Sequence, residues 1–432
     1  MRLVISNPQV HLIGRTLLDL VISRKGHKKY SFFITEYILS KNRDVAFIVD
    51  GSKSSLNGIG IRFVLLSKVI SYIELLIWMI INNINPLKVK VYFNVDNLNP
   101  KKDIILNYSH STIDGSYVLN NNNMQFHKYD GVVLTHLTHY FVGTNHISKY
   151  LSSVKNSFLL AENDISHNMY FMNFFPDVKS VYQLPFTLSP RFKDTQTFSD
   201  RSDKCMAVGT ISQAITHPLN DYFGKGQNLH PMRKTLYDNR KISKYQKQIE
   251  FLLYLYDDIN NLKTAKKNDS FVTKICKKYL PYFILEKFYP NFLNKYFSFN
   301  IVEKYNSYKM FISPEEIVGL PSVNVFEGMA CGCAYIGLED DMYKRIGMIN
   351  GLNYISYDGS FSMLIEKIKY YQRHQNELER IAINGRNYVL EQFSEKNISD
   401  IFWTDMDKLL KSFNKGGANF TSSFVKRAIR ND

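Results

Sequence analysis

The residues best suited to bind a charged substrate lie in one short part of the chain, 308–337. The pattern there predicts a strand, a loop rich in glycine and proline, a helix and a second strand, over 309–313, 314–322, 323–330 and 334–337. The backbone amides at the start of a helix have no partner inside the helix and carry partial positive charge. The start of this helix is therefore predicted to hold a diphosphate.

Three polar side chains stand near the start of the same predicted helix. Ser322 and Asn324 can cap the helix and can also donate hydrogen bonds to phosphate oxygens. The carboxylate of Glu327 can accept hydrogen bonds from the two vicinal hydroxyls of a ribose. Taken alone, Glu327 is explained as well by a structural role beside the helix dipole. Together, the three side chains favour a site for phosphate and ribose.

This stretch resembles a known family. The segments PSVNVFEGMACGCAYIG, GLNYISYD and LERIAINGRNYVLEQFS are similar to the C-terminal domain of GT-B glycosyltransferases of the family 4 type. The resemblance is clear over 308–393 and extends weakly to 205–237, through VGTIS and HPMRKTLY. The segment QLPFTLSPRF, 183–192, looks like the family's connection between two domains.

The resemblance implies an α/β protein with two Rossmann-like domains facing a central cleft. The C-terminal domain would hold a nucleotide-sugar donor and the N-terminal domain an acceptor. Glu327 matches the second acid of the family's paired-glutamate motif, which binds the donor ribose. The first acid would stand eight residues earlier, where this chain has Gly319, so Glu315 or Glu316 would have to replace it.

The resemblance also implies a set of donor-binding residues. Basic side chains at the start of the C-terminal domain would neutralise the diphosphate, and Arg233 is preferred to Lys225 because its planar guanidinium matches phosphate oxygens. A fixed cation there would stabilise the charge that builds on the leaving phosphate, which makes Arg233 a catalytic candidate too. The predicted donor-binding residues are Gly209, Thr210, Arg233, Lys234, Gly319, Pro321, Ser322, Val323, Asn324 and Glu327.

Acid and base candidates lie around the segment GVVLTHLTHYF. Asp130, His136 and His139 are close to the end of a predicted strand, and a histidine facing the cleft could act as a base or hold the sugar. A structural role is the alternative for each. The dipeptides His217-Pro218 and His230-Pro231 resemble a motif of sialic acid and Kdo transferases. A CMP-activated sugar is therefore an alternative donor.

No cofactor and no metal are expected. The acidic run 339–341 follows the second strand of the site and is predicted to be a solvated loop. Cys331 and Cys333 are too close in sequence for a closed zinc site and are predicted to be small buried residues. Retention of the sugar's configuration follows only from the family analogy.

Short apolar runs alternate with helical patterns through the N-terminal half. Strands are predicted over 45–49, 89–93, 104–106, 132–134 and 158–160, and helices over 30–39 and 146–154. This alternation favours a parallel sheet covered by helices. The domains are predicted over 1–190, a linker over 191–204, a second domain over 205–395 with a basic-aromatic insertion at about 263–300, and a C-terminal helix and basic tail over 396–432.

The charge of the chain indicates an anionic partner. Its 432 residues carry 54 Lys and Arg against 39 Asp and Glu, a net charge of +15, and 45% of them are hydrophobic, which excludes wholesale disorder. Segment 225–300 alone holds 15 basic and 6 acidic residues, a net +9. Lysine interleaved with tyrosine and phenylalanine over 274–297 suits a membrane interface, a solvated insertion or, less well, a single-stranded nucleic acid.

A second apolar stretch could interact with a membrane. Residues 61–81 are mainly apolar but include Arg62, Lys68 and Glu74, so they favour a buried helix over a helix in the membrane interface, and either over a span. We therefore expect a cytoplasmic protein, peripheral to the inner face of the plasma membrane, with no secretory leader.

The expected function is transfer of a sugar from a nucleotide-sugar donor to a glycan or lipid-linked acceptor, in the synthesis of a bacterial capsule or lipopolysaccharide. An anionic membrane surface is the other expected partner, and no nucleic acid is expected. Two rivals remain: a nucleic-acid-binding protein, and a catalytically silent member of a polysaccharide assembly complex.

Overall fold

The computed structural model describes residues 1–6, 43–49, 64–108, 126–137, 140–141, 144–178, 181–211, 219–255, 299–417 and 422–424. The chain forms two compact units. Unit 1 comprises Met1–Thr187 and Phe393–Asp432, and unit 2 comprises Leu188–Gln392. The segment predicted as a linker, 191–204, lies within unit 2, and the C-terminal helix belongs to unit 1.

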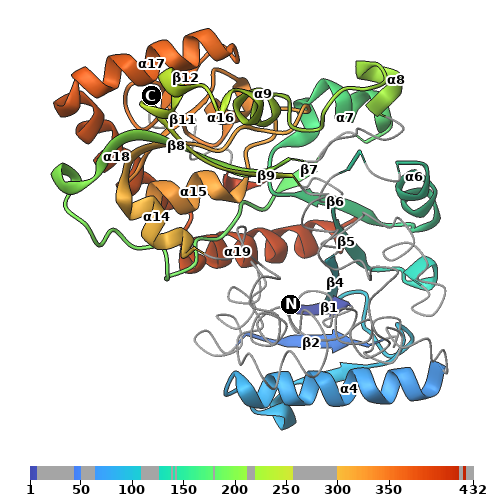
Figure 1. Cartoon of the computed structure of the whole chain (residues 1–432). Helices are drawn as coiled ribbons and strands as arrows, with labels where there is room; N and C mark the ends of the chain where they lie inside the picture. The colour runs from blue at the N-terminus through green and yellow to red at the C-terminus, as the bar shows by residue number, and fades with distance from the viewer. Residues whose placement is uncertain are drawn as a thin grey trace, which may run out of the picture. The chain divides into compact units, whose positions relative to one another are not determined.

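Unit 1 is built on a parallel sheet of seven strands in the order β3-β2-β1-β4-β5-β6-β7 (Figure 1). The strands are β1 (Arg2–Ser6), β2 (Val45–Ile48), β3 (Lys90–Tyr92), β4 (Asp103–Tyr108), β5 (Val132–His136), β6 (Ser157–Ala161) and β7 (Val181–Gln183). The strand order changes direction between β1 and β4. In sheets of this kind ligands bind beyond the carboxyl ends of the strands at such a point.

The helices of unit 1 pack around this sheet. They are α4 (Val64–Ile81), α6 (Thr144–Ser153), α7 (Met169–Phe174) and α19 (Glu395–Phe413), with short 3-10 turns at η2 (Pro86–Lys88), η4 (Phe126–Lys128) and η5 (Ile165–His167). Trp78 of α4 meets Phe47 of β2 edge to face, with ring centroids 6.3 Å apart. Tyr182 of β7 donates a hydrogen bond to Asp405 of α19 at 3.0 Å. The last long helix of the chain is thereby fixed to the first unit.

Unit 2 has a parallel sheet of five strands in the order β12-β11-β10-β8-β9. Its elements are η6 (Phe198–Asp200), β8 (Ser202–Ile211), α8 (Leu219–Phe223), α9 (Pro231–Asn239), α10 (Ser243–Gln246), β9 (Ile249–Leu255), α14 (Ile301–Ser307), β10 (Tyr308–Ile312), α15 (Val323–Ala330), β11 (Ala334–Leu338), α16 (Asp341–Arg345), β12 (Ile355–Tyr357), α17 (Phe361–Arg373) and α18 (Gln375–Gln392). Helices α9 and α17 cover one face and α14, α15 and α18 the other (Figure 1). The order reverses between β8 and β10.

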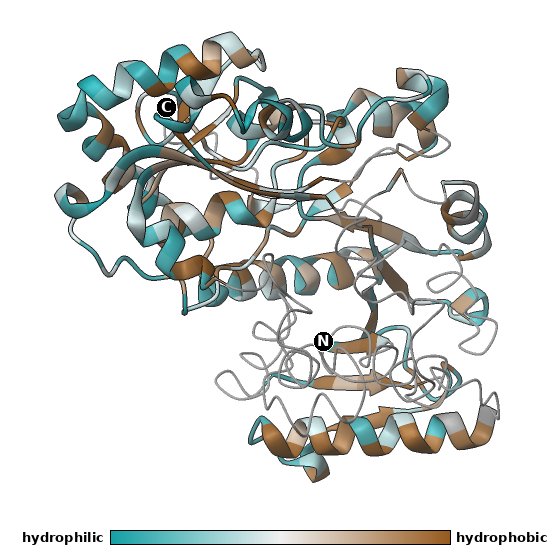
Figure 2. Cartoon of the chain, in the orientation of Figure 1, coloured by the Kyte–Doolittle hydropathy of each residue, from teal (hydrophilic) through white to brown (hydrophobic). Residues whose placement is uncertain are grey.

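The predicted α/β class with two parallel sheets is confirmed. Figure 2 shows why the strands form: the sheets are hydrophobic, and β2, β5 and β10 are almost wholly buried. All five strands predicted in the N-terminal half are present, as is the helix predicted over 146–154. The predicted helix 30–39 and most of the insertion 263–300 lie outside the described residues. The apolar stretch 61–81 contains α4, and among the described residues no helix is long and apolar enough to cross a membrane.

Candidate functional site

The candidate site lies where the order of strands reverses in unit 2. The carboxyl end of β8 carries Gly209 and Thr210, and the carboxyl end of β10 leads into Ser313 and Pro314. Because β8 and β10 are parallel neighbours, these ends meet at one edge of the sheet. Helix α9 follows β8, and α15 follows β10 after the loop 314–322. Local sequence order therefore brings two helix starts to one edge.

Arg233 joins the ends of the two strands. Its Nε donates to the carbonyl of Pro314 at 2.6 Å, and its Nη1 donates to the carbonyl of Thr210 at 2.9 Å. The residue is only 6% exposed although it lies in the first turn of α9. The two carbonyls hold the guanidinium at the edge of the sheet, so its positive charge is fixed where a ligand of this fold class binds.

Gly209 makes room for that arginine. Its φ is +148°, and a Cβ atom placed there would lie 2.9 Å from Nε of Arg233. Any larger side chain would be strained and would also displace the guanidinium. The glycine is therefore needed for a close approach rather than for a turn.

The loop after β10 is tied to the start of α9. Ile317 donates its backbone N–H to the carbonyl of Leu229 at 2.7 Å, and Gly319, at φ +78°, closes a tight turn by donating to the carbonyl of Glu316 at 2.8 Å. The Nε2 atom of His230 lies 3.9 Å from Oε1 of Glu316. A carboxylate and an imidazole thus face each other near the start of the helix that carries Arg233. The sequence analysis treated these two groups as separate motifs.

Helix α15 begins at the same edge. Within the described residues the side chain of Ser322, the N-cap, accepts no hydrogen bond from the helix backbone; its Oγ lies 3.4 Å from Oγ of Ser313. Asn324 donates to the same Ser313 hydroxyl at 3.4 Å. The hydroxyls of both serines and the Asn324 amide therefore lie close together at the start of the helix, where free backbone amides can bind an anion.

The charges of Glu327 and Arg233 both affect the pKa of Tyr305. Burial raises the pKa of Tyr305 well above its ordinary value, the Glu327 carboxylate raises it further, and Arg233 lowers it. Both charges are therefore within electrostatic reach of one hydroxyl. Glu327 is half-buried on α15. The predicted acid and the predicted cation thus have opposite effects on the pKa of the same tyrosine.

The other predicted donor residues are placed differently. Pro321 and Val323 are buried at the start of α15, where they shape the turn. Lys234 pairs with Asp238 one turn further along α9, with Nζ 2.6 Å from Oδ1. Lys225 is exposed between two glycines of positive φ.

Glu315 is part of the interior and does not line the site. Its carboxylate is buried, accepts a hydrogen bond from the hydroxyl of Tyr335 at 3.1 Å and is also bonded by the hydroxyl of Tyr343. Burial raises its pKa above the ordinary value. Of the two acids that could replace the family's first glutamate, Glu316 is the one beside the candidate site.

The acid and base candidates of unit 1 do not come together. Asp130 precedes β5 and His136 is its last residue, so the two stand at opposite ends of one strand. Asp130 is exposed and pairs with Lys155 at 2.9 Å. His136 is 0% exposed, and its Nε2 lies 3.4 Å from Oε1 of Glu162. His139, His217 and Pro218 lie outside the described residues.

Among the residues described, no three His, Cys, Asp or Glu side chains are placed to hold a metal ion. In the acidic run 339–341, Asp340 is the N-cap of α16 and accepts the N–H of Met342 at 2.7 Å. Cys331 and Cys333 are buried, as predicted.

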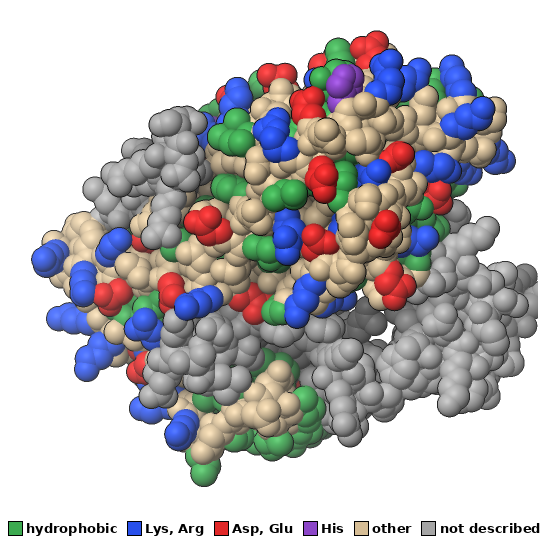
Figure 3. Space-filling model, turned by 90° about the vertical axis from the view of Figure 1, so that its left-hand side faces the viewer, with side chains coloured by type: hydrophobic (Ala, Val, Ile, Leu, Met, Phe, Trp, Pro, Cys, Tyr) green, Lys and Arg blue, Asp and Glu red, His purple; other side chains and the backbone are tan. Residues whose placement is uncertain are grey.

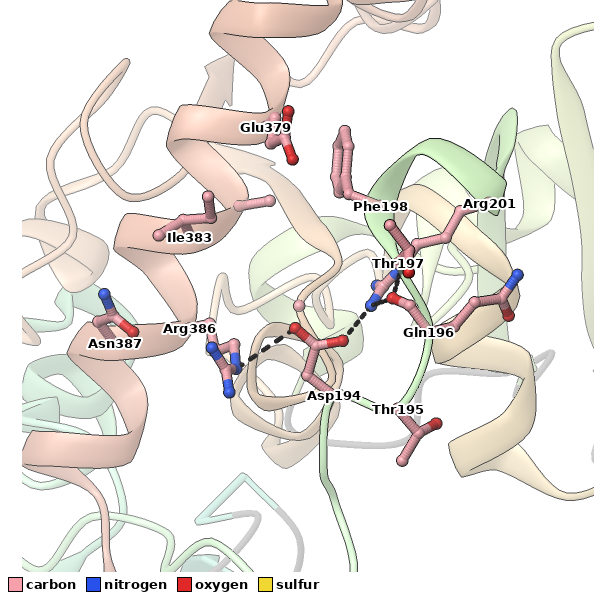
Figure 4. A pocket seen from close by; sticks show the side chains of 12 residues that line it. Asp194, Thr195, Gln196, Thr197, Phe198, Arg201, Glu379, Ile383, Arg386 and Asn387 are labelled. Carbon is pink, nitrogen blue, oxygen red and sulfur yellow. Dashed lines mark hydrogen bonds and ion pairs between the residues drawn. The ribbon is translucent and has the colours of Figure 1, made fainter.

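Sequence reasoning missed a polar pocket at the opposite edge of the unit 2 sheet. The pocket has a volume of about 600 Å³ and lies between 194–201, at the amino end of β8, and α18 (Figure 4). Asp194 is bonded by the guanidinium of Arg201, and its Oδ2 lies 3.5 Å from Nε of Arg386. Its lining comes partly from 194–201, a polar run without periodicity, so no local pattern marked it.

Comparison with known proteins gives structural likeness only. No protein-family model matches the sequence, and no curated protein matches it. Sucrose-phosphate synthase from Thermosynechococcus elongatus is 10% identical with a TM-score of 0.49, over 96% of this chain and all of that one.

Two further solved structures are similar at the same level. HepE from Anabaena, solved with UDP and glucose, is 10% identical with a TM-score of 0.48, over 95% of this chain and all of that one. A glycosyltransferase from Rickettsia africae is 12% identical with a TM-score of 0.45, over 95% and 98%.

Proposed function

We propose that this chain is a glycosyltransferase that moves a sugar from a nucleotide diphosphate donor. The observation that carries the proposal is the position of Arg233. Its guanidinium is held by the carbonyls of Thr210 and Pro314 at the edge where β8 and β10 end, beside the start of α15. A fixed cation and a helix start at one sheet edge are the two elements that bind a diphosphate.

The donor would be held from three directions. The first amides of α15, with Ser322 and Asn324, would donate to the phosphate oxygens. Glu327 would accept hydrogen bonds from the ribose hydroxyls. Arg233 would stabilise the negative charge that builds on the phosphate as the bond to the sugar breaks. Its two carbonyl partners keep it in place, so little reorganisation is needed during the reaction.

The sequence motif around α15 supports the same reading. The run 321–337, with its proline, acid and Ala-Cys-Gly end, resembles the donor domain of family 4 glycosyltransferases, and the structure forms the strand, loop, helix and strand that this motif requires. Glu316 lies in the loop that precedes α15, and its Oε1 is 3.9 Å from Nε2 of His230. We propose that Glu316 replaces the missing first acid.

The acceptor and the setting are further parts of the proposal. We propose a surface polysaccharide or lipid-linked glycan as acceptor, an anionic membrane as partner, retention of configuration and no metal requirement. The basic composition of 225–300 supports the membrane partner. We propose no acid or base from unit 1, because Asp130 stands before the amino end of β5 and His136, at its carboxyl end, is fully buried.

A thermal-shift panel tests the donor. Wild-type protein is titrated with UDP-, GDP-, CMP- and ADP-sugars; UDP-glucose is tried first, because HepE has been solved with it. At least one donor should raise the melting temperature in a saturable way, and Glu327→Ala should weaken that response. Glu366→Ala, an exposed glutamate on α17, is the matched control. No shift with any nucleotide sugar would contradict the proposal.

A second readout separates an enzyme from a silent binding protein. With the stabilising donor, release of free nucleotide is followed over time. An active transferase should release nucleotide, slowly by hydrolysis or faster with acceptor, and Arg233→Lys should slow that release. Saturable binding with no release under any acceptor condition would favour the silent partner instead.

A further inference from the structure

Helix α4 exposes apolar side chains on its outer face. Leu65 is 78% exposed, Ile80 is 64% exposed and Val69 is 46% exposed. Ile73 and Leu66 are also exposed. A helix at the surface of a water-soluble domain normally turns a polar face outward, so this face is unlike an ordinary solvent-facing one.

The exposed residues form one stripe together with the half-buried Leu76 and Ile77. At 100° per residue, positions 65, 66, 69, 73, 76, 77 and 80 fall within an arc of about 120°. All seven are Leu, Ile or Val. The opposite side of the helix is also largely apolar and packs on the sheet through Leu75, Trp78 and Met79. The one acidic residue of α4, Glu74, is buried on that inner side, so no acidic side chain interrupts the stripe.

Three exposed or half-buried lysines lie on α4 or on the two elements that follow it in the chain. Lys68 lies on α4, and its Nζ is 3.5 Å from the carbonyl of Phe93. The turn η2 after α4 adds Leu87, which is 94% exposed, and Lys88. Lys90 is exposed on β3, the edge strand of the sheet. Figure 3 shows hydrophobic side chains with lysine or arginine beside them at the lower end of the molecule, where α4 lies in Figure 1.

We propose that the outer face of α4, with Leu87 and the lysines 68, 88 and 90, docks on an anionic membrane surface. The aliphatic stripe would enter the boundary between headgroups and acyl chains, and the lysines would pair with anionic headgroups. The exposed ring of Phe93, 6.0 Å from that of Tyr72, lies beside the stripe and suits the same boundary. This surface does not depend on the proposed function, which explains only why such an enzyme would need it.

Vesicle sedimentation tests this proposal. The full chain is mixed with vesicles of phosphatidylcholine, with or without about a third of phosphatidylglycerol. We expect binding to the anionic vesicles. A variant carrying Leu65→Ser, Val69→Ser and Ile80→Ser should bind at least tenfold more weakly. Replacing Lys68, Lys88 and Lys90 by Gln should weaken binding at least tenfold, since each lysine near an anionic surface contributes roughly fivefold.

A matched control replaces three exposed apolar residues of unit 2, Ile242, Ile383 and Leu390, by Ser. This control should bind vesicles like the wild type. Circular dichroism checks the fold, and the lysine variant keeps the test valid if the serine variant does not fold. Equal binding by all proteins, no binding to anionic vesicles, or a wild-type dimer that the serine variant abolishes in light scattering would each overturn the proposal.

The donor titration is repeated on the same variants. It should be unchanged, because α4 lies in unit 1 and the candidate donor site in unit 2. If no donor binds any of these proteins, the proposed function fails while the vesicle result stands. If donors bind and the vesicles do not, only the membrane surface is rejected.

Discussion

The guanidinium of Arg233 lies directly over the backbone of Gly209, so close that a Cβ atom on Gly209 would be 2.9 Å from Nε. The arginine comes from the first turn of α9 and the glycine from the carboxyl end of β8. This contact fixes a positive charge between two strand ends.

Gly209→Ala should reduce donor binding and stability together. The new methyl group would meet Arg233, and φ of +148° is a region that residues other than glycine avoid, at a cost of about 1–3 kcal/mol. Chemical denaturation measures the loss of stability, and calorimetric titration measures donor affinity. Gly224→Ala is the control, because its φ is also positive and nothing lies within 4 Å of its added Cβ. Undiminished donor affinity in Gly209→Ala would show that the position of Arg233 is unimportant.

Arg233→Lys should weaken donor binding far more than Lys234→Gln does. Lysine cannot bridge the two carbonyls with a planar fork, so its charge would no longer be fixed at the strand ends. Loss of a hydrogen bond to a charged group costs about 1.5–3 kcal/mol, which is roughly a tenfold to hundredfold rise in Kd. Lys234 pairs with Asp238 in an exposed i,i+4 arrangement worth about 0.3–0.5 kcal/mol. Equal effects of the two changes on Kd would contradict the assignment.

Glu327→Gln should lower donor affinity while leaving the fold intact. The neutral amide keeps the size of the side chain but accepts hydrogen bonds from ribose hydroxyls less strongly. We expect Kd to rise roughly tenfold, with a melting temperature within a few degrees of the wild type. A 2′-deoxy donor supplies the second arm: it should lose affinity for the wild type but little for the variant. Equal losses for both proteins would place the carboxylate away from the ribose.

Glu315→Gln should become more stable relative to the wild type as the pH rises from acid to neutral. Burial raises the pKa of Glu315 above 4.5, so the folded protein holds this proton more tightly than the unfolded chain does. The stabilisation from this group is then fully present below the unfolded pKa and is lost as pH rises through the folded pKa. Glutamine still accepts the hydroxyls of Tyr335 and Tyr343 and carries no charge. Unfolding of both proteins from pH 4 to 8 measures the difference, and parallel pH profiles would refute it.

Asp130→Asn should leave stability and turnover unchanged, because its side chain is 72% exposed and its pair with Lys155 is at the surface. His136→Ala should instead destabilise unit 1 by about 1–3 kcal/mol, since it removes a buried polar partner of Glu162. Denaturation and nucleotide release are measured on both variants. A large loss of turnover in Asp130→Asn at unchanged stability would restore its catalytic role.

The sequence predicted the local parts of this site well. Helix α15 begins and ends at the predicted residues, because a proline and glycine loop precedes it and Cys331-Gly332 follows it. Arg233 was predicted from its planar guanidinium and its place near the start of the C-terminal domain. Its partners Thr210 and Pro314 are 23 and 81 residues away, so only the fold could reveal them.

Features set by distant contacts were not predicted. The strand β1 is central in its sheet, yet its five residues become a strand only through pairing with β2 and β4 on either side. Asp130 and His136 are six residues apart, and the sequence analysis placed them in one site. The extended strand β5 lies between them and holds them at its two opposite ends. Asp194, in the loop before η6, meets Arg386 of α18, and no spacing in the sequence records that contact.

Hydrogen–deuterium exchange with and without a nucleotide sugar tests the central claim most directly. If the start of α15 holds the diphosphate, a saturating donor should slow exchange of the amides of 313–327 and of the β8 end, 208–211, while 194–201 and 379–387 exchange as before. Protection confined to the pocket around Asp194 and Arg386, or unchanged exchange at α15 with donor bound, would contradict it.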